Sequence, residues 1–223
     1  MPMSSVKIPR PFDAIELRVL GSLLEKEQTT PEAYPLTVNS LILACNQKTN
    51  RDPITELSEG QVWDALERLR HETLVWRSEG ARTERWQQSV SRRWGLDSAG
   101  KALMTLLLLR GPQTLGELRT RSERMHAFPS IEAVEAKLQS LAADEEPLVV
   151  ELPRRPGQKE IRWMHRVGDP NAVDLPPAEP VRGVHEAPMP SGPPLSQRVT
   201  DLEKAVADLA AALAELKAKL GEE

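Results

Sequence analysis

The segment ACNQKTNRDP, residues 44–53, concentrates side chains that could bind a charged partner. Between two stretches with helical periodicity it carries three amides and two cations: Asn46, Gln47, Asn50, Lys48 and Arg51. Amide and guanidinium groups can hydrogen-bond to base edges or phosphates, and they can equally bind a carboxylate. The same groups can instead tie a long turn together by bonding to its backbone. The sequence leaves both interpretations open: a nucleic-acid or partner contact, and a structural loop.

Catalytic and metal-binding chemistry finds little support in the rest of the chain. The four histidines are scattered, without metal-ligand spacing to one another or to the single cysteine: His71, His126, His165 and His185. The sequence has neither a phosphate-cradling glycine loop nor a nucleophile elbow. Cys45 falls on the apolar stripe of a predicted helix, where a small buried side chain is expected rather than a nucleophile. We therefore expect no enzymatic activity, no cofactor and no metal.

The overall composition suggests a cytoplasmic protein whose charge gives no general attraction to nucleic acid. The chain has 223 residues and a formal net charge of −4, so any nucleic-acid surface must be local. A single cysteine is consistent with a reducing compartment. The first residues contain no signal-peptide pattern, and the apolar run 102–109 is far shorter than the ~20 residues needed to span a bilayer. We expect a cytoplasmic location and no membrane partner.

The elements that must position these residues form a pattern that occurs twice. Capping signals predict helices that start at Asp13, Ser58, Thr114 and Ser130, and apolar patterns predict two more from Thr37 and from Asp97. The apolar positions of VWDALERL, residues 62–69, match those of VEAKLQSL, residues 134–141. Each stretch is followed by a predicted β-hairpin, within residues 74–88 and 148–165. Helix, helix, helix and hairpin therefore repeat in the chain.

This repeat predicts a mainly α fold with small β-hairpins, arranged as tandem winged helix-turn-helix domains at residues 12–94 and 95–166. From position 24 to position 62 there are 38 steps, whereas the corresponding interval from 109 to 134 has 25. The amide-rich segment therefore enlarges the turn before the supposed recognition helix of the first domain.

Three stretches resemble the YceH-like family of uncharacterised bacterial proteins. They are TTPEAYPLTVNSLILACNQKTNRDP at residues 29–53, LLLLRGPQTLGELRTRS at 106–122 and RWMH at 162–165. The resemblance covers roughly residues 12–166, and ACNQKTNRDP is its most specific element. It implies a tandem winged-helix fold and a bacterial cytoplasmic protein, and it brings no established activity.

Charge separates the predicted hairpins from the third helices. Residues 58–72 hold four acids against two arginines, and residues 130–146 hold five acids against one lysine. Residues 76–94 instead carry five arginines against two glutamates, and residues 153–166 carry five basic residues against one glutamate. We expect DNA contacts, to phosphates and the minor groove, mainly from these basic hairpins. Beside the amide-rich segment, the expected contact residues are Arg82, Arg85, Arg154, Arg155 and Lys159. Solvated hairpin tips are the alternative.

The C-terminal part divides into a proline-rich stretch and a heptad repeat. Residues 167–194 hold eight prolines and almost no large apolar side chains, which predicts a disordered, extended linker. In residues 195–220 apolar side chains alternate in steps of four and three: Leu195, Val199, Leu202, Val206, Leu209, Leu213, Leu216 and Leu220. Valine at a positions with leucine at d favours a parallel two-stranded coiled coil, and hence a dimer. A higher oligomer, or a helix that folds back on its own protein, is the alternative.

Two functions are compatible with these patterns. One is a dimeric regulator that binds DNA mainly through its hairpins. The alternative is a non-enzymatic adaptor that uses winged helices as protein-docking surfaces, which the acidic third helices favour. Trp63, one residue off the apolar stripe of the third helix, is expected to pack against the first hairpin, with exposure toward a protein partner as the alternative.

Overall fold

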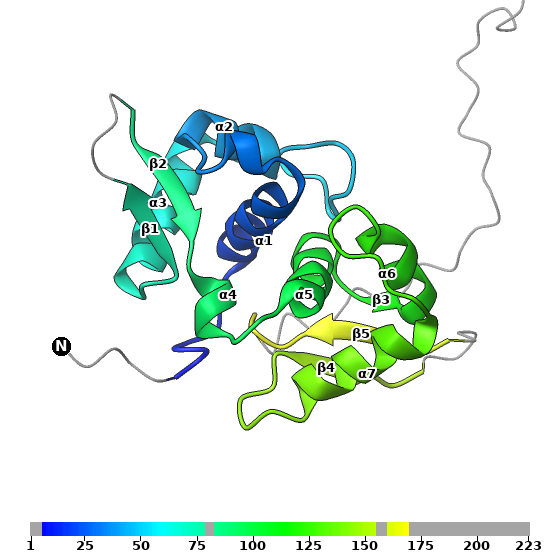
Figure 1. The fold of residues 1–223 in the computed structure, drawn as a ribbon. Helices are drawn as coiled ribbons and strands as arrows, with labels where there is room; N and C mark the ends of the chain where they lie inside the picture. The colour runs from blue at the N-terminus through cyan, green and yellow to red at the C-terminus, as the bar shows by residue number, and fades with distance from the viewer. Residues whose placement is uncertain (1–5, 79–82, 155–159, 170–223) are drawn as a thin grey trace, which may run out of the picture. The chain divides into compact units, whose positions relative to one another are not determined.

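The computed structural model describes residues 6–78, 83–154 and 160–169, which are mostly helical with small antiparallel hairpins (Figure 1). This architecture is compatible with a winged helix. The chain divides into two units, Met1–Asp174 and Leu175–Glu223, and every described residue lies in the first. The predicted coiled coil and all of the predicted linker after residue 169 lie outside the described residues, as do Arg82, Arg155 and Lys159.

Three helices form the first half of the described chain: α1 (Ala14–Thr29), α2 (Val38–Cys45) and α3 (Glu59–His71). The short 3-10 helix η1 (Pro31–Ala33) separates α1 from α2. The side chain of Asp13 accepts hydrogen bonds from the first backbone N–H groups of α1, and Ser58 and Thr37 do the same for α3 and α2. These caps confirm the predicted helix starts, because a side-chain acceptor satisfies amides that have no partner inside the helix.

The first hairpin consists of β1 (Val75–Ser78) and β2 (Arg85–Gln88), with Ser78 opposite Arg85. Leu36, just before α2, extends this pairing because it exchanges two backbone hydrogen bonds with Trp86, at 3.0 and 2.7 Å. Trp63 of α3 packs edge-on against Trp86, with ring centroids 5.8 Å apart. This contact confirms that Trp63 packs against the hairpin.

The second half contains α5 (Ser98–Arg110), α6 (Leu115–Ser122) and α7 (Ile131–Ala142), and α4 (Val90–Arg93) connects it to the first. Its hairpin is formed by β4 (Val149–Leu152) and β5 (Arg162–His165). The short strand β3 (Gln113–Thr114), which the sequence pattern does not predict, pairs with β5 and gives the order β3-β5-β4.

Backbone hydrogen bonds after the third helix of each half correspond. Leu74 N–H donates to Leu69 O at 2.9 Å, and Leu148 N–H donates to Leu141 O at 3.1 Å. The carbonyls of Leu74 and Leu148 accept hydrogen bonds from the residue just after the second strand of each hairpin. Ser89 N–H donates to Leu74 O at 2.9 Å, and Arg166 N–H donates to Leu148 O at 2.8 Å. The chain therefore leaves α3 and α7 and enters the two hairpins in the same way.

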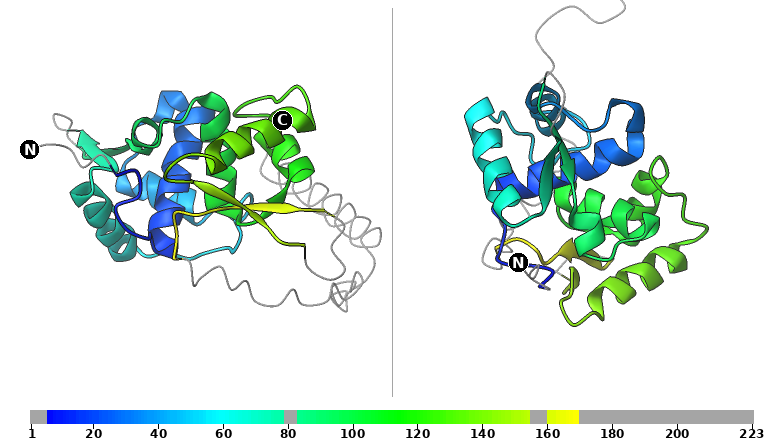
Figure 2. Two further views of the ribbon diagram at one scale, coloured as in Figure 1. Left: turned by 90° about the horizontal axis from the view of Figure 1, so that it is seen from below. Right: turned by 60° about the vertical axis from the view of Figure 1, so that its left-hand side comes forward.

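The two halves meet where α1 packs along α5, and the views agree on this contact (Figures 1 and 2). The whole apolar run 102–109 of α5 is buried, which explains why this helix lacks a polar face. Gly21 lets the helices approach, because a Cβ at this position would come within 2.8 Å of Leu109 Cδ2. Among the described helices, none combines the length and apolar character needed to cross a bilayer.

The packed structure continues beyond the second hairpin. Val167 is fully buried, and its carbonyl accepts a 3.0 Å hydrogen bond from Phe12 N–H, just before α1. The residue belongs to the predicted proline-rich linker, but its apolar side chain and its carbonyl are used by the core. The core of the described region therefore includes one residue of the predicted linker.

Candidate functional site

Arg51 holds the amide-rich loop together from inside. Its side chain is inaccessible to solvent and forms a bidentate ion pair with Glu25 of α1, at 3.1 and 2.6 Å. The same guanidinium donates two bonds to the carbonyl of Ala44, at 3.0 and 2.8 Å, and one to Gln47 Oε1 at 2.9 Å. In this position Arg51 stabilises the loop and is not available to a nucleic-acid or protein partner, which the residue pattern had left as an alternative.

Arg18 of α1 supports the same loop from its other end. It is 4% exposed and donates to the carbonyls of Cys45 and Pro53, at 3.1 and 2.6 Å. Burial and the nearby charge of Arg51 lower its pKa. Two arginines are thus buried beneath a single loop, an arrangement that needs dense hydrogen bonding to offset the loss of hydration. The sequence signal for this role is a cation within the apolar segment of the first helix.

The three amides also take structural partners. Asn46 exchanges two hydrogen bonds with the backbone of Leu57, at 2.9 and 2.7 Å, and so closes the loop just before α3. Asn50 has a positive φ of 59°, which asparagine tolerates better than most residues, and its Oδ1 accepts a 2.9 Å bond from Arg110. Gln47 is held by Arg51, as described above. The loop is therefore internally bonded, as the structural interpretation of the segment expects.

Lys48 differs from its neighbours in the loop. It is exposed and makes no hydrogen bond or ion pair with the part of the chain that the structure describes. Among the residues of the amide-rich segment that were expected to contact a partner, Lys48 is the cation whose charge is available to solvent.

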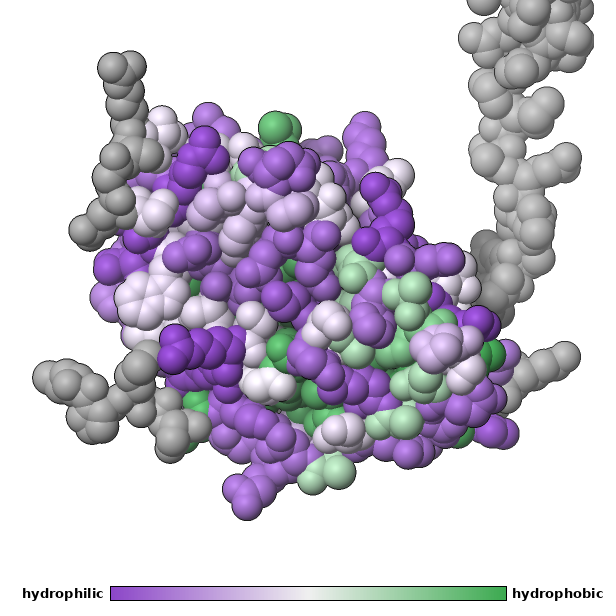
Figure 3. All heavy atoms as spheres, viewed as in Figure 1, coloured by the Kyte–Doolittle hydropathy of each residue, from purple (hydrophilic) through white to green (hydrophobic). Residues whose placement is uncertain are grey.

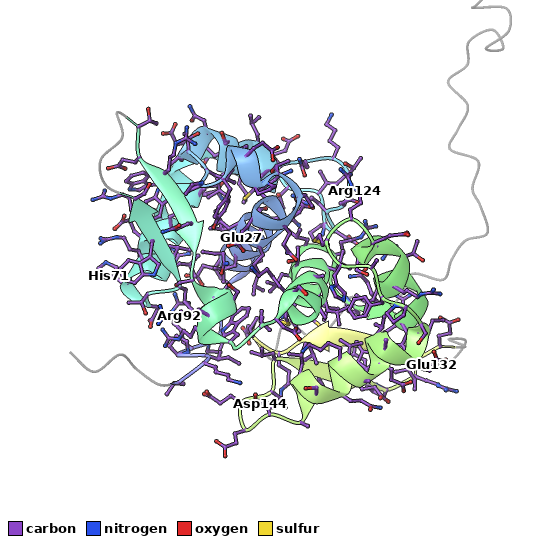
Figure 4. All side chains as sticks on the ribbon, in the orientation of Figure 1. Glu27, His71, Arg92, Arg124, Glu132 and Asp144 are labelled. Carbon is purple, nitrogen blue, oxygen red and sulfur yellow. The ribbon has the colours of Figure 1, made fainter. Side chains whose placement is uncertain are left out.

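The outer edge of the loop borders a groove of about 550 Å³ between the two halves. The end of α1, the loop, the end of α5 and the residues around the end of α6 line it, including Lys26, Gln47, Asn50, Leu109, Arg124 and Met125. Arg124 lies near the loop between α2 and α3 (Figure 4). On the face shown in Figure 3, apolar surface gathers in the region of α5 and α6, whereas hydrophilic side chains cover most of the first half.

The arginines of the first hairpin region have different surroundings. Arg77 is exposed and paired with Glu84 across the hairpin at 2.9 Å, and Arg85 is exposed and donates to Pro35 O at 2.9 Å. Arg93 instead closes the end of α3, because it donates to Glu72 O at 2.6 Å and to Val6 O at 2.8 Å. Arg93 therefore does not add to the available charge that the count of arginines suggested.

In the second hairpin region, Arg154 and Arg166 are exposed, and the half-buried Arg162 donates to Pro112 O at 3.2 Å. The third helices keep their acidic character, with Glu59 and Asp64 exposed on α3 and Glu132 exposed on α7 (Figure 4). Positive charge therefore stays on the hairpin side of each half, as far as the described residues extend.

Trp76 is the residue of the first hairpin that the sequence pattern does not single out. Its side chain on β1 is 48% exposed and borders a hollow of about 210 Å³, together with Thr73, Val75 and two cations, Arg70 and Arg77. Alternation along a strand could have indicated it, because Val75 is buried and the next side chain must face the other way. A half-exposed indole and two guanidinium groups that line one hollow can contact an anionic or aromatic partner.

Burial keeps two titratable side chains, Cys45 and His165, in their neutral forms. Burial raises the pKa of the Cys45 thiol to about 11, so the sulfur is protonated at neutral pH. Burial also lowers the pKa of His165 to about 4, which keeps its ring neutral. Within the described residues, no three histidine, cysteine, aspartate or glutamate side chains gather in a way that could hold a metal ion.

Comparisons with known proteins place the described region in one family. A family model described as "Protein of unknown function, DUF480" matches residues 12–158. A UPF0502 protein of Delftia acidovorans is 46% identical over 200 residues, which cover 86% of this chain and 85% of the relative. A UPF0502 protein of Pseudomonas putida is 48% identical, with 73% and 75% covered. One from an Acidovorax species is 49% identical, with 74% and 76% covered. The expected resemblance to an uncharacterised bacterial family is confirmed.

Proposed function

This chain belongs to the DUF480 family, and we propose that it is a non-enzymatic DNA-binding regulator built from two winged-helix units. The order of three helices and a hairpin in each half supports two such units. So do the matching backbone bonds at Leu74 and Leu148, and the pairing of the residues before the second helix with the hairpin, an isolated bridge at Leu36 in the first half and the strand β3 in the second. We place the protein in the cytoplasm, as its composition suggests.

The observation that carries this proposal is the surface around Trp76. The indole ring can lie against a sugar or an exposed base, while Arg70 and Arg77, which line the same hollow, can donate to phosphate oxygens. Glu67 and Glu84 hold these two arginines at 2.7 and 2.9 Å. Each carboxylate fixes its arginine while part of the guanidinium remains free to donate to a phosphate.

The acidic third helices restrict how DNA would be bound. Exposed carboxylates of Glu59 and Asp64 on α3 would repel the phosphates that border the major groove. Arg68 does not compensate, because Asp13 and Glu16 hold it at 2.7 and 2.9 Å. Contacts through the hairpins, to phosphates and the minor groove, avoid this repulsion and give modest sequence selectivity.

Self-association would strengthen such binding. We propose that the heptad positions between Leu195 and Leu220 form a two-stranded coiled coil that joins two copies of the chain. Two weakly binding modules gain effective concentration when they are linked, so a dimer would bind a long duplex more tightly than a monomer.

Fluorescence anisotropy of a labelled duplex, titrated with the full chain, tests the hairpin contact. We expect Arg154→Glu/Arg155→Glu to weaken binding by about tenfold or more, and salt to reduce wild-type affinity steeply. Arg119→Glu is the matched control, because Arg119 is an exposed arginine of α6, outside both hairpins. Equal affinity of the hairpin variant and the wild type would exclude the proposed DNA contact through the second hairpin.

The second candidate function is that of a protein-interaction adaptor. The acidic faces of α3 and α7 favour it, as do two exposed apolar side chains, Leu43 at 74% and Ile54 at 59%. Capture of partners by the tagged chain, with and without nuclease treatment, separates the two functions. Partners that survive the nuclease support an adaptor, and partners lost with the nucleic acid support DNA binding.

A further inference from the structure

Two residues that line the groove beside the amide-rich loop, Gln47 and Asn50, carry amide groups whose oxygen atoms are already hydrogen-bonded. Gln47 Oε1 accepts from Arg51, and Asn50 Oδ1 accepts from Arg110. Arginine has donors only, so each amide oxygen must face its arginine, and each NH₂ group must point to another partner. Neither NH₂ group makes a hydrogen bond within the described part of the chain, and both residues line the groove.

Positive charge accompanies these donors. Arg124 lines the groove, is exposed, and forms no ion pair with the described residues. Lys26 lies 3.6 Å from Glu25, but that carboxylate is already held in a bidentate pair by the buried Arg51. Glu123 is the remaining acid of the lining. Cations therefore outweigh acids at this surface.

Two further arginines, Arg110 and Arg121, lie at or next to the groove. Arg110 is hydrogen-bonded to Asn50 at the edge of the groove. Burial and the neighbouring charge of Arg121 lower the pKa of Arg110, although Asp52 and Glu117 act in the opposite direction. Arg121 itself lines the groove and is held by Gln113 and Glu117, at 2.7 and 3.1 Å. An oxyanion in the groove would relieve the repulsion between these guanidinium groups.

The floor of the groove is apolar. Leu106 and Leu109 of α5 and the partly buried Met125 contribute to it. A volume of about 550 Å³ lies in the range of sites for small organic molecules, which are roughly 300 to 1,000 Å³. Donors and cations at the rim, with an apolar floor, fit a molecule that has an anionic head and an apolar body.

We propose that this groove is a binding site for a small organic oxyanion, a molecule with a carboxylate or phosphate group on an apolar body. Arg124, Lys26 and the amide NH₂ groups of Gln47 and Asn50 bind the anionic group, and Met125 and Leu106 contact the body. The ligand contacts both halves, because α1 and the loop lie on one side of the groove and α5 and α6 on the other. This site is separate from the hairpins and independent of the proposed contact with DNA.

Two-dimensional NMR of the ¹⁵N-labelled full chain tests the proposal with benzoate and phenyl phosphate as probes and benzyl alcohol as the neutral control. We expect saturable shifts of the side-chain amide signals of Gln47 and Asn50 with at least one anion and none with the alcohol. Benzoate alone would indicate a carboxylate ligand, and phenyl phosphate alone a phosphate. Absence of saturable shifts with both anions, or equal shifts with the alcohol, would overturn the proposal.

A pair of arginine variants makes the test specific. Arg124→Ala should weaken the probe by about tenfold, the effect of losing one charge-assisted contact. Arg92→Ala is the control, because Arg92 is an exposed arginine on α4, away from the groove (Figure 4). Equal loss in both variants, or no loss in Arg124→Ala, would contradict the site. Because Arg154→Glu/Arg155→Glu should bind the probe as the wild type does, failure of DNA binding leaves this result unaffected.

Discussion

At the scale of single residues, the amide-rich loop shows how a polar motif can be chiefly internal. Arg51 and Arg18 lie beneath the loop and donate to carbonyls that have no partner within a helix or strand. Ordering a long loop costs conformational entropy, which these hydrogen bonds help to offset. They also fix the position of the loop's outer edge, which borders the groove. The buried Arg18 and Arg51 thus hold residues 44–53 in the conformation in which the loop borders the groove.

We expect Arg51→Lys to lower the free energy of unfolding by about 2 kcal/mol or more. Lysine keeps the charge, but it cannot make the bidentate pair with Glu25 and the bonds to Ala44 and Gln47 at the same time. Denaturant unfolding followed by circular dichroism measures the change. Lys48→Ala, an exposed change in the same loop, is the control and should stay within about 0.5 kcal/mol of the wild type. Equal stability of all three proteins would show that the buried pair does not hold the loop.

A second residue-scale prediction concerns acid stability. Burial alone would raise the pKa of Glu16, but hydrogen bonds from Arg10, from the Asp13 backbone and from Arg68 lower it from 4.5 to about 2. Because the pKa of Glu16 is lower in the folded protein than in the unfolded chain, its ionised carboxylate adds to the free energy of unfolding. This stabilisation is complete above pH 4.5 and is lost as the pH falls toward 2. Glu16→Gln should therefore lower the free energy of unfolding at pH 7. It should also make that free energy depend less on pH between pH 4.5 and 2. Parallel stability curves for the two proteins in that window would contradict the assignment.

At the scale of elements, the contact between α1 and α5 depends on Gly21. We expect Gly21→Ala to destabilise the fold by about 1 to 3 kcal/mol, because the new methyl would meet the buried Leu109. Gly60→Ala in α3 is the matched control, since nothing lies within 4 Å of its Cβ position, and it should raise stability by up to about 1 kcal/mol. Thermal unfolding of the two variants gives the comparison. A Gly21→Ala protein as stable as the wild type would show that the helices can separate without cost.

Patterns among neighbouring residues predicted most of the helices and both hairpins. They did not reveal which distant segments pair with each other. Caps at Asp13, Ser58 and Thr114 depend on residues within one turn of the helix start, so the sequence displays them directly. The strand β3 has only two residues, and its pairing with β5 leaves no local pattern. The role of Arg51 depends in the same way on Glu25 in another helix. The available charge of the hairpins was likewise overestimated at Arg93, whose acceptors lie outside them.

At the scale of the whole molecule, we expect self-association through the heptad segment. Leu209→Asp places a charge at a d position and should convert the dimer to a monomer in sedimentation velocity experiments. Ala211→Asp, at the outward f position of the same heptad, is the control and should remain dimeric. A wild-type chain that sediments as a monomer would refute the proposed coiled coil.

We propose that DNA contacts the hairpins, together with Arg70 at the end of α3, and not the acidic exposed side chains of the third helices. Photocrosslinking of the full chain to a duplex with 5-iodouracil in place of thymine, followed by mass spectrometry of the adducts, tests it most directly. We expect adducts within residues 75–88 and 149–165, with Trp76 among them, and their loss at high salt. Adducts confined to residues 59–71 and 131–142, or no adducts at low salt, would contradict it.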